Sequence, residues 1–267
     1  PLHRSTSQTC LQLIGDHASF GLMQGVMNPA VTRSLMLNVL LSCALLALLA
    51  ATFSPLPGLG VDFVAISLGI FVAASLPLLF FAWRHLESTS FGPANSVTLL
   101  RLALTAMLLA LTIAPASTAL LWLCIGVATA TLLLDGLDGR LARKYGSSSR
   151  FGARFDMEVD AILICVLALL AWHFERAGVW VLTAGLLRYV FVGAAMILPW
   201  LRAALPPSIR RKTVCILQST TLLVCMGPII PAVLAPWIAA AGIALLTWSF
   251  AIDVLWLYER HHRGVRA

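Results

Sequence analysis

The sequence predicts an all-α protein that crosses a membrane several times. Hydrophobic residues make up 60% of the 267 positions and charged residues only 11%, with a mean hydropathy of +0.93, whereas soluble domains are about 25% charged. Apolar runs of about 20 residues, the length of a membrane-spanning helix, recur as far as the C-terminal end. One cleaved signal peptide does not explain runs that recur in this way.

Eight apolar segments are the predicted spans, at about 34–53, 61–83, 97–114, 117–138, 156–174, 178–200, 213–233 and 236–256. Asp62 suits the start of the second helix, where a carboxylate meets the positive end of the helix dipole. Pro- or Gly-containing breaks alternate with basic loops, such as 139–155 and 202–212. Three segments flank the spans: a tail or interfacial segment at 1–33, an interfacial linker at 84–96 and a basic tail at 257–267.

The basic residues gather on one side of this predicted topology. The formal net charge is +7, and 15 of the 18 Lys and Arg lie in loops or tails on the side shared by both termini. Only Arg176 falls in a loop of the other side, and Arg101 and Arg188 fall inside spans. This positive-inside pattern assigns both termini and the basic loops to the cytoplasm. It accounts for the charge without a nucleic-acid partner.

Acidic residues concentrate in residues 135–160, which hold five of the eleven Asp and Glu. Asp135 and Asp138 lie three positions apart, and Asp156 and Asp160 four, so each pair shares one face of a helix. The first pair ends one apolar run and the second begins the next. Carboxylates packed this closely repel one another unless a cation lies among them. The pattern therefore predicts a metal site where two helix ends meet at one membrane surface.

The same stretch reads D-x2-D-G-x2-A-R-x8-G-x3-D-x3-D and resembles the signature of the CDP-alcohol phosphatidyltransferase family. The resemblance implies a six-helix core, here residues 97–256, with the signature bridging its second and third helices. Residues 34–83 would then form an extra two-helix module. It also implies displacement of CMP from a CDP-linked substrate by an acceptor hydroxyl, two Mg²⁺ or Mn²⁺ ions as cofactors, and a homodimer.

Roles for the signature residues follow from this resemblance. Four residues are implied metal ligands, namely Asp135, Asp138, Asp156 and Asp160, and Asp160 is also the implied general base on the acceptor hydroxyl. Four others are implied contacts of the CDP moiety: Gly139, Ala142, Arg143 and Gly152. Glu158 lies on another face of its helix and outside the signature.

A second resemblance opens the third span, where Asn95, Thr98 and Arg101 match the N-x-x-T-x-x-R start of the first core helix in the family. The alternative is an N-cap at Asn95 and an arginine whose charge reaches back to the membrane surface. A charge inside a span is costly, so we expect Arg101 to pair with the carboxylates or with a phosphate.

Candidate acceptor contacts follow in the C-terminal half, at Arg188, Arg211 and Lys212. Lys212 and Gln218 partly resemble the K-T-x-x-Q of phosphatidylglycerophosphate synthase-like members, with the glutamine two positions late. A basic loop usually reflects topology alone. Arg188 differs because it falls inside a span and needs a partner, which an anionic acceptor would supply. We read Asp253, in the last span, as structural.

The leading hypothesis is an enzyme of phospholipid biosynthesis that transfers the phosphatidyl group of CDP-diacylglycerol to a small polar alcohol. The acceptor is phosphorylated, as in glycerol 3-phosphate or an inositol phosphate, or is choline or serine. The reverse arrangement, CDP-choline or CDP-ethanolamine acting on diacylglycerol, shares the signature. An ion-coupled transporter is a distant alternative, because the carboxylates lie at one surface and no repeated halves are evident. A bacterial inner membrane with a cytoplasmic active site is the expected location.

Overall fold

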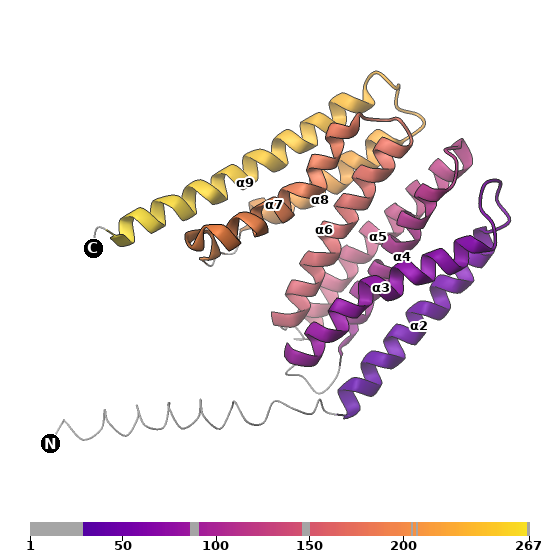
Figure 1. Cartoon of the computed structure of the whole chain (residues 1–267), viewed down its shortest axis with the longest axis horizontal. Helices are drawn as coiled ribbons and strands as arrows, with labels where there is room; N and C mark the ends of the chain where they lie inside the picture. Colours follow the sequence, from indigo (N-terminus) through magenta and orange to yellow (C-terminus); the bar gives the residue numbers. More distant parts are fainter. Residues whose placement is uncertain (1–28, 86–90, 146–149, 204, 207, 266–267) are drawn as a thin grey trace.

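The computed structural model describes residues 29–85, 91–145, 150–203, 205–206 and 208–265, and this part of the chain is helical with no strand. Its α-helices, drawn in Figure 1, are α2 (Pro29–Phe53), α3 (Asp62–His85), α4 (Pro93–Ala110), α5 (Thr118–Tyr145), α6 (Arg150–His173), α7 (Thr183–Ile197), α8 (Ile209–Met226) and α9 (Ala235–Val265). Short 3-10 turns follow α4 and flank α7, at Leu111–Ile113, Val179–Leu182 and Pro199–Arg202.

The all-α membrane class is confirmed, with one helix at each predicted span. Five helical segments are long and apolar enough to cross a membrane: Val31–Phe53, Pro93–Ile113, Thr118–Gly136, Val179–Ile197 and Ala235–His262. The apolar part of α3 that is described is shorter, Asp62–Pro77. Helices α6 and α8 are absent from this group within the described residues. Each of these two helices begins with charged side chains, which lower its hydropathy.

Three predicted helix boundaries are wrong: the end of α5, the start of α6 and the end of α8. The basic loop predicted at 139–155 is mostly helical, because α5 continues to Tyr145 and α6 already begins at Arg150. Leu, Ala, Arg and Lys, which fill much of this stretch, are good helix formers despite their different polarity. The seventh span, predicted to reach 233, ends at Met226 because Gly227 and a proline follow. Most of the predicted tail 1–33, part of the linker 84–96 and the end of the tail 257–267 lie outside the described residues.

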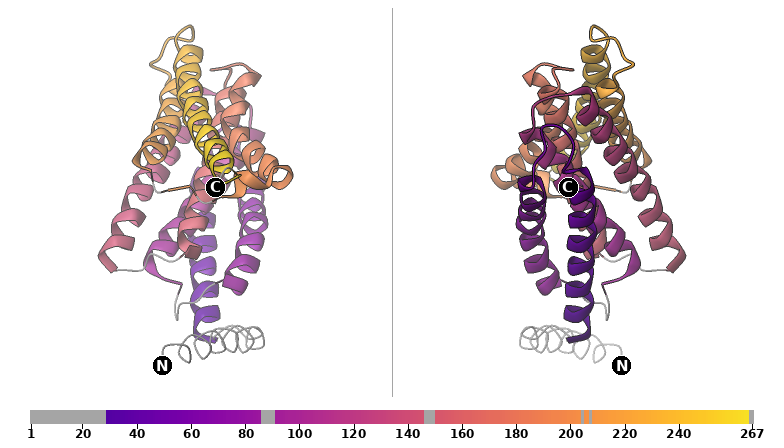
Figure 2. Two further views of the ribbon diagram at one scale, coloured as in Figure 1. Left: turned by 90° about the vertical axis from the view of Figure 1, so that its left-hand side faces the viewer. Right: turned by 90° about the vertical axis from the view of Figure 1, so that its right-hand side faces the viewer.

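The helices pack as a layered bundle. Helix α4 contacts α2, α3, α5 and α6, while α6 also contacts α7 and α8, and α8 packs along α9. In Figure 2, α9 faces the viewer in the left-hand view, and α2 and α3 face the viewer in the right-hand view. These helices therefore lie on opposite flanks of the bundle. One hydrophobic cluster joins the two N-terminal helices to the others, since Leu46 and Phe71 are buried with Leu99, Met107 and Leu167. The first two helices thus pack into the same core as α4.

Polar contacts tie together the connections at the end of the bundle away from the acidic stretch. The Nε2 of His173, at the end of α6, lies 3.0 Å from the carbonyl oxygen of Ala114, after α4. Arg176 donates to the carbonyl oxygens of Gly227 at 3.0 Å and Ile230 at 3.4 Å. The loops after α4, α6 and α8 are predicted to lie on one side of the membrane. Their contacts with one another agree with helices that alternate in direction.

Candidate active site

Three helices deliver four charged side chains to one point. Arg101 of α4 lies between the carboxylates of α5 and α6, with its Nη1 3.0 Å from Oδ1 of Asp135 and 2.6 Å from Oδ1 of Asp156. Its Nη2 donates to Oδ1 of Asp160. The arginine is completely buried, whereas the three aspartate side chains are 26–39% exposed. The predicted pairing of Arg101 with the carboxylates is therefore present in the structure.

The start of α4 explains how Arg101 reaches this place. Asn95, Thr98 and Arg101 recur every three positions along one face, and all three are buried. Gly92 precedes the helix, so Asn95 lies inside the first turn, where its Nδ2 donates to the carbonyl of Phe91 at 2.5 Å. The alternative of an N-cap at Asn95 is therefore wrong, because Gly92 is the N-cap of α4. The Oγ1 of Thr98 donates to the carbonyl oxygen of Ala94, one turn earlier, at 3.1 Å.

The charge balance of this cluster favours a cation. In this group of described side chains, three carboxylates share the single positive charge of Arg101, so negative groups outnumber positive ones. One ligand oxygen from each of Asp135, Asp156 and Asp160 can be chosen so that all lie within 4.8 Å of one another. Oxygens on opposite sides of an ion coordinated at about 2.1 Å are separated by a similar distance. The donor set therefore fits a hard divalent cation such as Mg²⁺ or Mn²⁺.

The remaining signature residues lie on the same two helices. Asp138, Gly139, Ala142 and Arg143 follow Asp135 along α5, but the placement of their side chains lies outside the described part of the structure. Gly152 lies in the first turn of α6, ahead of Asp156. The backbone thus puts the signature along the end of α5 and the start of α6.

Arg188 has a protein partner that the sequence did not suggest. Its Nη2, on α7, donates to Oε1 of Glu158 on α6. Glu158 balances the charge of Arg188 in this structure, and the contact of Arg188 with an anionic acceptor stays a prediction. Only the position of Glu158 between two signature residues could have drawn attention to it. The pairing itself depends on how α7 packs on α6.

The basic residues at the start of α8 divide into two groups. Arg210 donates to Asp253 of α9 at 2.5 Å and to the carbonyl of Ser249 at 2.6 Å, and Arg211 lies 3.6 Å from the same carboxylate. Arg211 also donates to the carbonyl of Pro206. Asp253 thus joins α8 to α9, in agreement with its structural interpretation.

Lys212 belongs to the second group because its charge acts on the carboxylate cluster. Its positive charge reaches Asp135 across the contact between α5 and α8. Cys215, one turn further along α8, lies within electrostatic range of Asp160, Asp135 and Arg188. Helix α8 packs against both helices that carry the carboxylates, α5 and α6.

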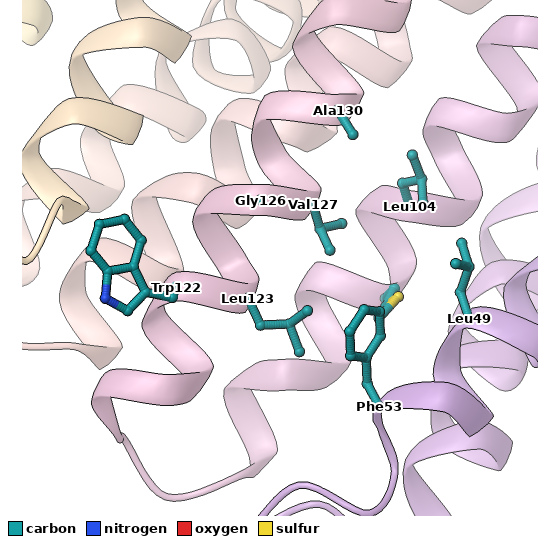
Figure 3. A pocket seen from close by; sticks show the side chains of 9 residues that line it. Leu49, Phe53, Leu104, Trp122, Leu123, Gly126, Val127 and Ala130 are labelled. Carbon is teal, nitrogen blue, oxygen red and sulfur yellow. The ribbon is translucent and has the colours of Figure 1, made fainter.

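An apolar pocket of about 310 Å³ lies elsewhere, between α2, α4 and α5. Figure 3 shows Leu49 and Phe53 of α2 on one side and Leu123 and Val127 of α5 on the other. Every lining residue is glycine or has an apolar or tryptophan side chain. The pocket has no group for phosphate chemistry, so the carboxylate cluster remains the candidate active site.

Comparison with known proteins identifies the family of the chain. The family model of CDP-alcohol phosphatidyltransferase matches residues 91–250, which run from α4 to the middle of α9 and make up more than half of the 267 residues. No curated protein and no solved structure matches the chain. The matched region contains Arg101 and the three clustered carboxylates. The chain belongs to the CDP-alcohol phosphatidyltransferase family and is a transferase of substituted phosphate groups.

Proposed function

We propose that this enzyme transfers the phosphatidyl group of CDP-diacylglycerol to the hydroxyl of a small polar alcohol and releases CMP. The observation that carries the proposal is the convergence of three carboxylates, Asp135, Asp156 and Asp160, on the one guanidinium of Arg101. A carboxylate site where helix ends meet a membrane surface suits a metal-bound diphosphate attached to a lipid. The reaction would place the protein in phospholipid biosynthesis.

Asp135, Asp156 and Asp160 would hold the divalent cation. Asp138, which lies on α5 with Asp135, would be a further ligand. We expect two ions, Mg²⁺ or Mn²⁺, from the family resemblance. When bound, they neutralise charge on the diphosphate and so favour departure of CMP. Gly139, Ala142, Arg143 and Gly152 are the proposed contacts of the CDP moiety.

Asp160 is the proposed general base. Arg101 contacts one oxygen of this carboxylate, Oδ1, and so orients it, while a carboxylate has a second oxygen that can take a proton. The proton of the acceptor hydroxyl passes to Asp160 as the acceptor oxygen bonds to the phosphorus that carries diacylglycerol. The bond from this phosphorus to the bridging oxygen breaks, and CMP leaves with the electron pair.

A phosphorylated acceptor, such as glycerol 3-phosphate or an inositol phosphate, is our preferred second substrate. Lys212 supports this preference because its charge acts on Asp135. Arg188 pairs with Glu158, two positions before Asp160 on α6, and Arg211 precedes Lys212 at the start of α8. A phosphate held among these cations would be near the proposed base. Thr98, on the buried face that carries Arg101, is a further candidate contact.

The same cluster could serve a CDP-choline or CDP-ethanolamine donor with diacylglycerol, or choline or serine as acceptor. We further propose a homodimer in a bacterial inner membrane, with the active site and both termini on the cytoplasmic side. The positive-inside pattern of the sequence supports this orientation.

Purified protein in lipid vesicles tests the reaction. Labelled CDP-diacylglycerol, CDP-choline and CDP-ethanolamine are each supplied with Mg²⁺ and a panel of acceptors, and CMP release is measured. We expect release from CDP-diacylglycerol with a phosphorylated acceptor. Release from CDP-choline or CDP-ethanolamine alone would contradict the proposed donor. Failure with every donor would return attention to ion transport.

A further inference from the structure

Glu158 lies between two proposed metal ligands in the sequence, yet its side chain binds Arg188 of α7 instead of the cluster. We propose that Glu158 is a specificity-determining residue, which competes with the phosphate of the acceptor for Arg188. This inference rests on the proposed function. It assigns a role to a residue outside the family signature.

Arg188 has the unused hydrogen-bonding capacity of an anion site. Among the described residues its Nε is buried and has no hydrogen-bond partner, while Nη1 has the sulfur of Met157 at 3.7 Å. A thioether is a weak acceptor. Only Nη2 has a strong acceptor among these contacts, in Glu158. A phosphate could accept from Nε and Nη2 together, in the two-pronged geometry that arginine offers to oxyanions.

The position of Arg188 relates this anion site to the carboxylate cluster. Arg188 contacts Met157 and Glu158, which lie between Asp156 and Asp160 along α6. A small acceptor whose phosphate is held by Arg188 would therefore have its carbon skeleton near the proposed base.

The Glu158–Arg188 pair is suited to exchange. The Glu158 side chain is 53% exposed and that of Arg188 is 27% exposed, and ion pairs with this much contact with solvent are weak. Asp253, which holds Arg210 and Arg211, is only 12% exposed and joins two helices. Glu158 can therefore leave Arg188 at small cost when a phosphate arrives, whereas Asp253 has a fixed structural role.

The test compares Glu158→Gln with the wild type in the CMP-release assay. The acceptors are inositol 1-phosphate and glycerol 3-phosphate, each beside its unphosphorylated alcohol. We expect the variant to lower the KM for the phosphorylated acceptor that supports turnover about two- to five-fold, the range of an exposed ion pair. The kcat and the KM for CDP-diacylglycerol should stay unchanged. The KM for the unphosphorylated alcohol should not move either.

A double-mutant cycle with Arg188→Gln separates this role from a general change in charge. Arg188→Gln alone should raise the KM for the phosphorylated acceptor, and adding Glu158→Gln should then change nothing. An equal decrease in KM with and without Arg188 would overturn the inference. So would an unchanged KM in Glu158→Gln, or turnover with unphosphorylated alcohols only. Absence of CMP release from every donor would refute the proposed function itself.

Discussion

Replacing Arg101 by methionine should destabilise the metal-free protein and make its stability more dependent on a divalent cation. The arginine is fully buried and contacts three carboxylates. One pair of unit charges at about 4 Å contributes about 4 kcal/mol at an effective dielectric constant of 20. Arg101 makes three such pairs. Solvent screening of the partly exposed aspartates and the desolvation of the guanidinium offset much of their summed attraction. Breaking a buried pair costs about 3–5 kcal/mol, and we expect the lower end.

The assay is thermal unfolding of the purified protein in detergent, first with EDTA and then with Mg²⁺. A loss of about 3 kcal/mol corresponds to a decrease in Tm of about 6–12 °C for a chain of this size. Mg²⁺ should raise the Tm of Arg101→Met more than that of the wild type, because three carboxylates without the guanidinium bind a cation more strongly. Methionine fills much of the vacated volume, so a cavity contributes little.

Arg188→Met is the matched control, since it also removes an arginine that bonds to a carboxylate. Its pair with Glu158 is largely exposed, so the loss should be about 1 kcal/mol or less. Equal Tm values for Arg101→Met and the wild type in EDTA would refute the reasoning. An equal response of the two proteins to Mg²⁺ would also refute it.

Three further predictions concern the signature and the packing of the bundle. Asp160→Asn should abolish CMP release while preserving the unfolding temperature and the binding of CDP-diacylglycerol; normal turnover would remove its role as base. Asp138→Ala should raise the Mg²⁺ concentration needed for half-maximal activity, and an unchanged metal titration would exclude it as a ligand. Gly185→Ala should lower stability by about 1–3 kcal/mol, because its Cβ would lie 2.7 Å from the Cα of Cys165. Gly193→Ala, on the same helix but with nothing within 4 Å of its Cβ, should be neutral or stabilising in the same unfolding assay.

Much of the fold could be predicted from the sequence because each apolar run is long enough to be recognised as a helix. The boundaries were harder to predict where a helix and its apolar run end at different residues. Apolar composition ends near Asp138, yet α5 continues to Tyr145 because helix propensity does not depend on hydrophobicity. The opposite difference occurs in α8, where apolar residues continue past the helix end at Met226.

The centre of the site was predictable for a similar reason. An arginine inside a span has few acceptable partners, and the carboxylates of residues 135–160 were the obvious ones for Arg101. The same argument did not identify Glu158 as a partner of Arg188, because nothing in the sequence places α7 beside Glu158. Pairing between positions 30 residues apart depends on helix packing, which spacing within one helix does not determine.

The most direct test of the central claim is a metal titration of CMP release. Protein stripped with EDTA is supplied with CDP-diacylglycerol and a phosphorylated acceptor, and Mg²⁺ or Mn²⁺ is added back in steps. The carboxylate cluster predicts no release in EDTA and recovery as the cation is restored. CMP release that continues undiminished in EDTA would contradict a metal-dependent site at Asp135, Asp156 and Asp160.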